Sequence, residues 1–268
     1  MRTRRLFSLG ALYYVLLALF MYLPIVMLVI FSFNDSPLMV LPLKGFTLKW
    51  YQALAQATEM LRAARNSLFL GVITSLVATG LGTMAALAVM RYSFRLKGVF
   101  VAVASTPLVI PYVVLGVALL ILFNTLGIPL SLFTVGVGHV IIDTPYAMLI
   151  VSARLAGFPT SLEEAAQDLG ANYWLTLWRV VLPISMPAIL SAFLTSFTTS
   201  FDEFAVSFFL MGTEATLPVY VYSQLRFPNR LPIVVTLSAI VMVASVALLL
   251  LAENLRRAGQ PGLRKGGK

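Results

Sequence analysis

The chain has 268 residues, of which 60% are hydrophobic and only 11% charged, and it contains no cysteine. A soluble domain of this size carries about 25% charged residues, so this composition indicates an integral membrane protein. The formal net charge is +9, but the basic residues lie between the apolar segments, which argues against a nucleic-acid-binding face. Without cysteine there are no disulfides, thiolate metal sites or cysteine nucleophiles, and we expect neither a metal site nor a catalytic residue.

Six apolar segments are each long enough to cross a bilayer, because about 20 helical residues span its hydrocarbon core. They predict an all-α membrane protein with one transmembrane domain over residues 1–268. The first segment is too long for a cleaved signal peptide and lacks a small-residue exit, so we interpret it as a spanning helix. The predicted helices cover residues 11–33, 67–90, 99–123, 131–153, 187–211 and 231–252.

The distribution of basic residues predicts the topology, since lysine and arginine accumulate in cytoplasmic loops. If the N-terminus lies inside, the cytoplasmic segments hold thirteen basic residues and the outer segments hold six. We therefore expect both termini in the cytoplasm. The connection between the fourth and fifth helices, residues 154–186, is expected on the same side.

This connection begins with the pattern of a helix start. Ser161 is followed three residues later by Glu164, and Thr160 and Glu163 repeat the pattern one residue earlier. Either pair matches a capping box. The two acidic residues fall in the first turn, where negative charge suits the helix dipole.

The rest of the connection predicts a turn and a second short helix. Gly170 is a residue type that commonly ends helices, and Asn172 is expected to cap a helix that ends before Pro183. Ala165 and Ala166 leave a small, nearly featureless patch on the first helix. From these residues alone the connection is either a docking site for a partner or an amphipathic loop resting on lipid headgroups.

The spacing within the connection resembles the EAA signature of ABC importer permeases. Glu164-Ala165-Ala166 is followed after three residues by Gly170, and after nine more by Val180-x-Leu182-Pro183. The family pattern differs only in having isoleucine where this chain has Val180. Other segments are similar to spermidine/putrescine-type permeases, and more narrowly to their second permease subunit: SFND (32–35), WY (50–51), NSL (66–68), RYSFRLKG (91–98), GH (138–139), PY (145–146), ARLAGF (153–158), LEEAAQDLGA (162–171) and SFDEFAVSFF (200–209).

The resemblance implies a type I importer permease fold with cytoplasmic coupling helices between helices four and five, in the bacterial inner membrane. It also implies an assembly of this chain with a sister permease as a heterodimer, two cytoplasmic ATPase subunits and a periplasmic solute-binding protein. ATP and Mg²⁺ would bind the ATPase, because this chain has no Gly-rich phosphate loop with a lysine. The implied coupling residues are Glu163, Glu164, Ala165, Ala166, Asp168, Gly170, Leu182 and Pro183.

Four residues are candidates for a substrate path. Asp202 and Glu203 lie within the fifth predicted helix, where a carboxylate is costly and faces the bundle interior or water. Attraction of a cationic substrate is one interpretation, and an internal salt bridge or a contact with the partner permease is the other. Trp50 is either an interface anchor or a substrate contact, and Tyr146 belongs to the PY pair of the resemblance.

The leading prediction is a permease subunit of an ABC importer for polyamines or a similar small cationic solute. The alternative is an ion-coupled secondary transporter that uses His139, Asp143, Asp202 and Glu203. His139 and Asp143 lie four residues apart and could pair on one helix face, as a structural hydrogen bond or a proton relay. An intramembrane enzyme ranks third, because no HExxH, GxSxG or paired-aspartate motif is present.

Overall fold

The computed structural model describes residues 9–243, which form two compact units. One unit combines the segment up to Thr58 with the segment from Val221 onward, and the other spans Glu59–Tyr220. Within the described range every regular element is helical, apart from an isolated bridge between Asn34 and Phe46. The single domain expected over residues 1–268 stays a prediction.

The terminal unit contains the first apolar helix, α1 (Leu9–Ser32), and the short helix α2 (Lys49–Gln56). Almost none of the most apolar stretch of α1 is buried among the described residues, which fits a helix whose side chains face lipid. Between α1 and α2 the chain is held by polar contacts. Trp50 Nε1 donates to the Asn34 carbonyl at 2.8 Å, and the Ser32 and Tyr51 hydroxyls lie 2.8 Å apart.

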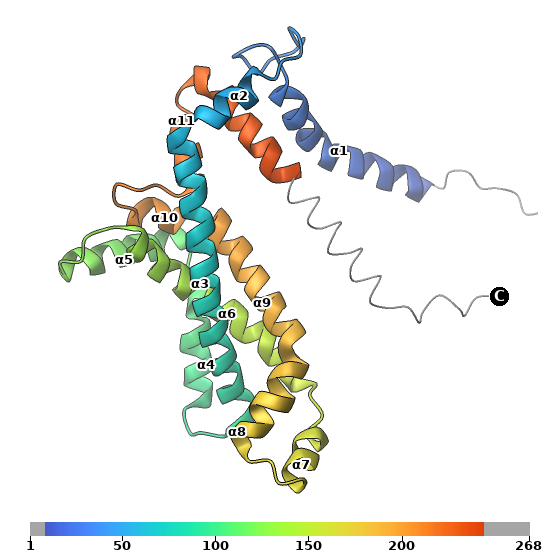
Figure 1. The fold of residues 1–268 in the computed structure, drawn as a ribbon, viewed down its shortest axis with the longest axis vertical. Helices are drawn as coiled ribbons and strands as arrows, with labels where there is room; N and C mark the ends of the chain where they lie inside the picture. The colour runs from blue at the N-terminus through green and yellow to red at the C-terminus, as the bar shows by residue number, and fades with distance from the viewer. Residues whose placement is uncertain (1–8, 244–268) are drawn as a thin grey trace, which may run out of the picture. The chain divides into compact units, whose positions relative to one another are not determined.

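The second unit is a helical bundle built on α3 (Thr58–Arg91), α6 (Leu132–Ala156) and α9 (Leu182–Asp202), which lie side by side in Figure 1. At Gly82 a Cβ atom would lie only 2.5 Å from the Ala147 Cβ, so α3 and α6 approach as closely as small residues allow. The remaining elements of the unit are α4 (Lys97–Ser105), η1 (Thr106–Leu108), α5 (Tyr112–Thr125), α7 (Ser161–Asp168), α8 (Tyr173–Thr176), the π-helical segment η2 (Leu177–Val181), α10 (Ala205–Leu210) and the beginning of α11 (Leu217–Gln224).

The third predicted helix, 99–123, is wrong as a continuous helix. It is a broken pair, α4 with η1 followed by α5, bent by 102°. Pro107 is the second residue of the 3₁₀ turn, and Pro111 is the N-cap residue of α5. Because a proline supplies no backbone N–H and clashes with the preceding turn, two prolines four residues apart end one helix and start another.

The fifth predicted helix, 187–211, both begins and ends earlier than expected. Helix runs without interruption from Tyr173 to Asp202, and the prediction that a helix would end before Pro183 is wrong. The π-helical segment immediately before Pro183 shifts the hydrogen-bond pattern there, and proline is tolerated at the first positions of α9. At the other end Glu203 has extended backbone angles (φ −69°, ψ 120°), which stops the helix.

The other predicted helices 11–33, 67–90 and 131–153 correspond to α1, α3 and α6. Of 231–252, the structure describes a helical stretch up to Val243, and the remainder lies outside the described residues. In residues 9–243, four helices are long and apolar enough to cross a membrane, and the bent pair makes a fifth if it counts as one span.

Candidate functional site

The connection between α6 and α9 folds as two helices around Gly170, as the sequence predicted. The Gly170 N–H donates to the Gln167 carbonyl at 2.8 Å, and the Ala171 N–H donates to the Ala166 carbonyl at 3.0 Å. This pair of bonds is the Schellman arrangement. Gly170 has φ +89°, a left-handed value that L side chains rarely adopt.

Only one of the two predicted caps forms. The Asn172 side chain accepts a hydrogen bond from the Leu175 N–H at 2.9 Å, which confirms it as the cap of α8. The predicted capping box at the start of α7 is wrong. Thr160 occupies the N-cap with helical angles (φ −61°, ψ −26°) and makes no side-chain capping bond, because a capping side chain reaches back only from an extended N-cap backbone.

The two faces of α7 have different surroundings. Glu164, Ala165 and Asp168 are exposed, whereas Glu163 and Ala166 are half-buried against the rest of the unit. Figure 1 shows α7 and α8 together at the end of the unit away from α5 and α10. The exposed face is therefore open to a partner.

The signature continues into the start of α9, where Leu182 is half-buried and Pro183 exposed. With Trp178 and Met186 among others they line a pocket of about 430 Å³ against α3. The end of the EAA signature therefore lies on the long helix itself and packs towards α3.

Glu163 forms an ion pair with Arg91, the last residue of α3. This contact was not predicted from the sequence, in which Arg91 counted among the basic residues and began the RYSFRLKG segment, and Glu163 was an expected coupling residue. The two residues lie 72 positions apart, so no local pattern could have joined them. The ion pair gives Glu163 a different environment from that of its neighbour Glu164, which is exposed.

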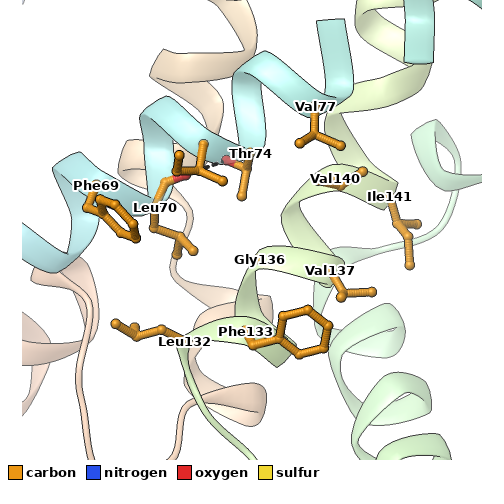
Figure 2. Close-up of a pocket in the computed structure, with 11 residues that line it drawn as sticks. Phe69, Leu70, Thr74, Val77, Leu132, Phe133, Gly136, Val137, Val140 and Ile141 are labelled. Atoms are coloured by element: carbon orange, nitrogen blue, oxygen red, sulfur yellow. Dashed lines mark hydrogen bonds between the residues drawn. The ribbon is translucent and has the colours of Figure 1, made fainter. Parts of the chain in front are cut away.

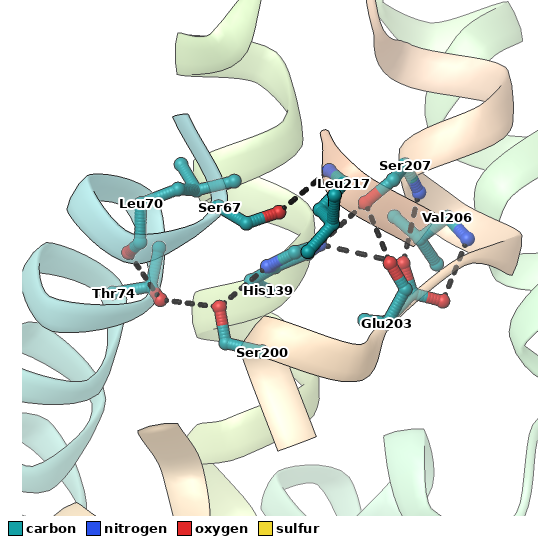
Figure 3. Close-up of polar contacts among 9 residues, drawn as sticks. All are labelled: Ser67, Leu70, Thr74, His139, Ser200, Glu203, Val206, Ser207 and Leu217. Atoms are coloured by element: carbon teal, nitrogen blue, oxygen red, sulfur yellow. Dashed lines mark hydrogen bonds and ion pairs between the residues drawn. The ribbon is translucent and has the colours of Figure 1, made fainter. Parts of the chain in front are cut away.

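A buried polar cluster links α3, α6, α9 and α10 (Figure 3). His139 Nδ1 lies 2.7 Å from the Ser200 hydroxyl, and His139 Nε2 lies 2.9 Å from the Ser207 hydroxyl. The Ser200 hydroxyl is in turn 2.8 Å from that of Thr74 on α3. The imidazole thus connects three helices through both of its ring nitrogens.

Glu203 belongs to the same cluster and is 6% exposed. Its two carboxylate oxygens accept hydrogen bonds from the Val206 N–H at 2.8 Å and the Ser207 N–H at 2.9 Å. One of them also lies 3.3 Å from His139 Nε2. A carboxylate that binds the first free N–H groups of a helix stabilises its N-terminus, so Glu203 holds α10 in place. The neighbouring Asp202 side chain is exposed.

The predicted pairing of His139 with Asp143 is wrong. The partners of His139 are on α9 and α10, and neither oxygen of Asp143 has a hydrogen-bond partner among the described residues, although Asp143 is fully buried. Tyr146, one turn further along α6, pairs its hydroxyl with that of Tyr112 at 3.1 Å. Trp50 lies in the terminal unit, where it contacts Asn34.

Two grooves run along the helices of the second unit. An apolar groove of about 500 Å³ between α3 and α6 is lined by side chains such as Phe69, Phe133 and Val140 (Figure 2). A second groove, of about 550 Å³, follows α9 and includes Ser191, Thr195 and Thr198. These residues and Asp202 follow one another at intervals of three or four positions, which places them on one face of the helix. This face of α9 therefore carries polar groups among apolar neighbours.

The family model described as binding-protein-dependent transport system inner membrane component matches residues 78–260. The chain belongs to this family. The permease is 34% identical over 239 residues to the spermidine/putrescine transport system permease protein PotC of Escherichia coli (strain K12), covering 89% of this chain and 90% of PotC. It is 36% identical over 215 residues to the putrescine transport system permease protein PotI of the same organism, covering 77% of this chain and 76% of PotI.

Solved structures show the same fold. A bacterial ABC transporter involved in the import of the acidic polysaccharide alginate aligns over 95% of this permease and 98% of its own chain, with a TM-score of 0.69 and 18% identity. The MetNI methionine ABC transporter aligns over 76% of this permease and 97% of its own chain, with a TM-score of 0.61 and 18% identity. The predicted family and the all-α importer permease fold are therefore confirmed. The chain is a multi-pass permease subunit of the inner membrane, and its family is one of transport proteins rather than enzymes.

Proposed function

We propose that this permease carries a small organic cation of the polyamine class. The relatives that it matches over most of its length are named for spermidine and putrescine. The chemistry of α9 supports the same class, since its groove carries the hydroxyls of Ser191, Thr195 and Thr198 and the same helix ends at the exposed carboxylate of Asp202. Hydroxyls and a carboxylate suit a protonated amine that has left its hydration shell.

The substrate path in this proposal runs along the polar face of α9, and Asp202 is the acidic residue that touches the substrate. The carboxylate oxygens of Glu203 already contact α10 and His139. In this proposal Glu203 therefore does not touch the substrate and instead holds Asp202 at the end of α9. Tyr146 and Trp50 remain candidates for the path, and each already has a hydrogen-bond partner. An ion-coupled transporter is not favoured, because its predicted pair of His139 and Asp143 does not form.

Transport is driven by ATP that a separate ATPase subunit binds with Mg²⁺, and α7 docks into that subunit. The observation that carries this proposal is the EAA signature folded as two helices around a positive-φ glycine, with Glu164, Ala165 and Asp168 exposed on one face. The assembly contains a sister permease, two such ATPases and a periplasmic binding protein. The solved relative in complex with an alginate pentasaccharide-bound periplasmic protein has this kind of outer partner.

Purification and uptake test the proposal together. The tagged full-length permease, extracted from its native host membrane, is expected to co-purify with an ATPase, a second permease and no redox or ion-translocating subunit. Cells that express the complete set are expected to take up radiolabelled putrescine or spermidine, and deletion of this permease alone should lower uptake at least tenfold. Uptake that persists after the ATPase is inactivated would refute the proposal.

The α6–α9 connection and both termini lie in the cytoplasm in this proposal, as the bias of basic residues indicates. A phosphatase reporter, which is active only in the periplasm, is expected to be inactive when fused after Lys268. The same reporter inserted after Lys44, in the connection between α1 and α2, should be active. The opposite pattern would reverse the topology and remove α7 from the reach of an ATPase.

A further inference from the structure

Arg91 and Glu163 join two elements that lie far apart in the sequence. Arg91 ends α3, and Glu163 lies in the first turn of α7. Their side chains form an ion pair and are only 16% and 18% exposed. Each charge also suits its own helix, since a cation favours the C-terminus of a helix and an anion favours the N-terminus.

The protein encloses this pair with apolar side chains. The guanidinium carbon of Arg91 lies 5.2 Å from the ring centre of Phe158, a side chain that is 5% exposed. The small cavity around the pair is lined by Leu87, Tyr173, Thr176, Leu177 and Val181 as well as the pair itself. Screening by water is weaker in such surroundings than at an open surface, so this pair is stronger than an exposed one.

The ion pair connects α7 to a helix that the backbone does not reach. Residues 157–160 join α7 to α6, and residues 169–172 join it to α8 and α9. A displacement of α7 therefore passes to α6 and α9 through the chain. Transmission of this displacement to α3 needs a side-chain contact, and the ion pair between Arg91 and Glu163 provides one.

Helix α3 in turn reaches the polar cluster. Thr74 lies 17 residues before Arg91 on the same helix, a distance of about 25 Å along the axis. Its hydroxyl contacts Ser200, which contacts His139. Ser200 is two residues before Asp202. A movement of Arg91 along the α3 axis would thus displace Thr74 and its contact with Ser200, close to Asp202, the acidic residue proposed for the substrate path.

We propose that Arg91 is a positioning residue for energy coupling: its ion pair with Glu163 holds α7 to α3, so that the ATPase moves both α3 and α9 when it displaces α7. The inference rests on the proposed function, in which α7 is the docking helix. It removes Glu163 from the docking face and gives it an intramolecular role. Glu164, Ala165 and Asp168 keep the contact with the ATPase.

The test uses the complete transporter in proteoliposomes, with the variants Arg91→Gln, Glu163→Gln, both together, and the charge exchange Arg91→Glu with Glu163→Arg. Each single variant is expected to co-purify with normal amounts of ATPase. Stimulation of ATP hydrolysis by the putrescine-loaded binding protein should fall about tenfold, and more ATP should be consumed per molecule transported. The double variant should be no worse than either single variant, and the charge exchange should recover at least a third of the stimulation.

Two control variants test whether a loss of stimulation comes from the ion pair itself or only from the removal of a positive charge in this region. Arg95→Gln removes an exposed cation four residues further along, and it should leave stimulation unchanged. Arg91→Lys keeps the charge and should retain more stimulation than Arg91→Gln. Single variants with wild-type ATP consumption per molecule transported would overturn the inference, and so would a charge exchange that recovers nothing although the complex is intact.

Further measurements distinguish failure of the inference from failure of the proposed function. If Glu163→Gln loses the ATPase, Glu163 belongs to the docking face and the inference falls while the proposed function stands. If Glu164→Lys on the exposed face leaves co-purification unchanged, the proposed docking helix itself is wrong. Thermal unfolding of the complete complex in detergent also tests the ion pair. The decreases in unfolding temperature caused by Arg91→Gln and Glu163→Gln should be non-additive, and additive decreases would overturn the inference.

Discussion

Replacing Gly170 with valine is expected to abolish transport while the permease still inserts and pairs with its partner. Gly170 has φ +89°, and the space around its Cα is open, so a side chain would meet no atom within 4 Å. The strain therefore comes from the backbone alone, and a β-branched residue in the left-handed region costs about 1–3 kcal/mol. The connection can relieve this strain by turning α7, which would move Glu164 and Ala165 out of register with the ATPase that we propose as its partner.

The measurements for Gly170→Val are putrescine uptake and the stimulation of ATP hydrolysis by the loaded binding protein. We expect uptake to fall at least tenfold and stimulation to disappear, with unchanged amounts of permease in the membrane. Gly157→Val is the matched control, because Gly157 lies in the same connection, is equally open, and has φ −94°. Asparagine tolerates the left-handed region better than valine, so Gly170→Asn should retain intermediate activity. Normal coupling in Gly170→Val would show that α7 does not transmit the energy of ATP hydrolysis.

Substitution of Asp202 should lower uptake, whereas substitution of Glu203 should lower the unfolding temperature, although the two residues are adjacent. Asp202→Asn removes an exposed carboxylate that the proposed function places on the substrate path. Uptake of putrescine is expected to fall about tenfold with the unfolding temperature unchanged. Glu203→Gln leaves one carbonyl oxygen for two N–H donors and turns an amide towards His139. Since an unsatisfied buried hydrogen-bonding group costs about 1–3 kcal/mol, this variant should unfold at a lower temperature.

The readouts for this pair are thermal unfolding in detergent and initial uptake rates at matched protein amounts. Glu59→Gln is a control for net charge, because Glu59 is exposed in the first turn of α3, and it should change neither value. A thermally intact Asp202→Asn variant with wild-type uptake would remove Asp202 from the path. A Glu203→Gln variant that keeps full stability would remove the structural role assigned to Glu203.

Some local helix signals of the sequence were confirmed, but the capping box expected at the start of α7 did not form. Gly170 ends α7 and Asn172 caps α8 as predicted, because both effects depend on hydrogen bonds within five residues. The apolar runs that became α1, α3 and α6 were equally clear, since membrane helices need about 20 apolar residues wherever they pack. The spacing of the EAA signature was sufficient to predict the family.

Breaks in the long helices could not be assigned from composition. Pro107 and Pro111 divide one apolar run into α4 and α5, whereas Pro183 lies in an uninterrupted helix. A proline breaks or continues a helix according to what satisfies the freed carbonyl groups, and that depends on neighbouring segments. The end of α9 at Asp202 is similar, because Glu203 binds the N–H groups of α10 only when the chain turns there.

The roles of titratable residues that lie close together in the sequence were decided only by the folded structure. The sequence grouped Glu163 with Glu164, Asp202 with Glu203, and His139 with Asp143. The fold separates all three pairs: Glu163 meets Arg91, Glu203 meets α10, and His139 meets Ser200 and Ser207. The sequence by itself determined that this is a membrane permease whose α6–α9 connection carries the EAA signature, because hydropathy and motif spacing are local properties. The partners of Glu163 and His139 are on helices far away in the chain, and no local pattern encodes those contacts. Glu203 binds N–H groups only three and four residues further on, but it can do so only because the long helix ends at Asp202.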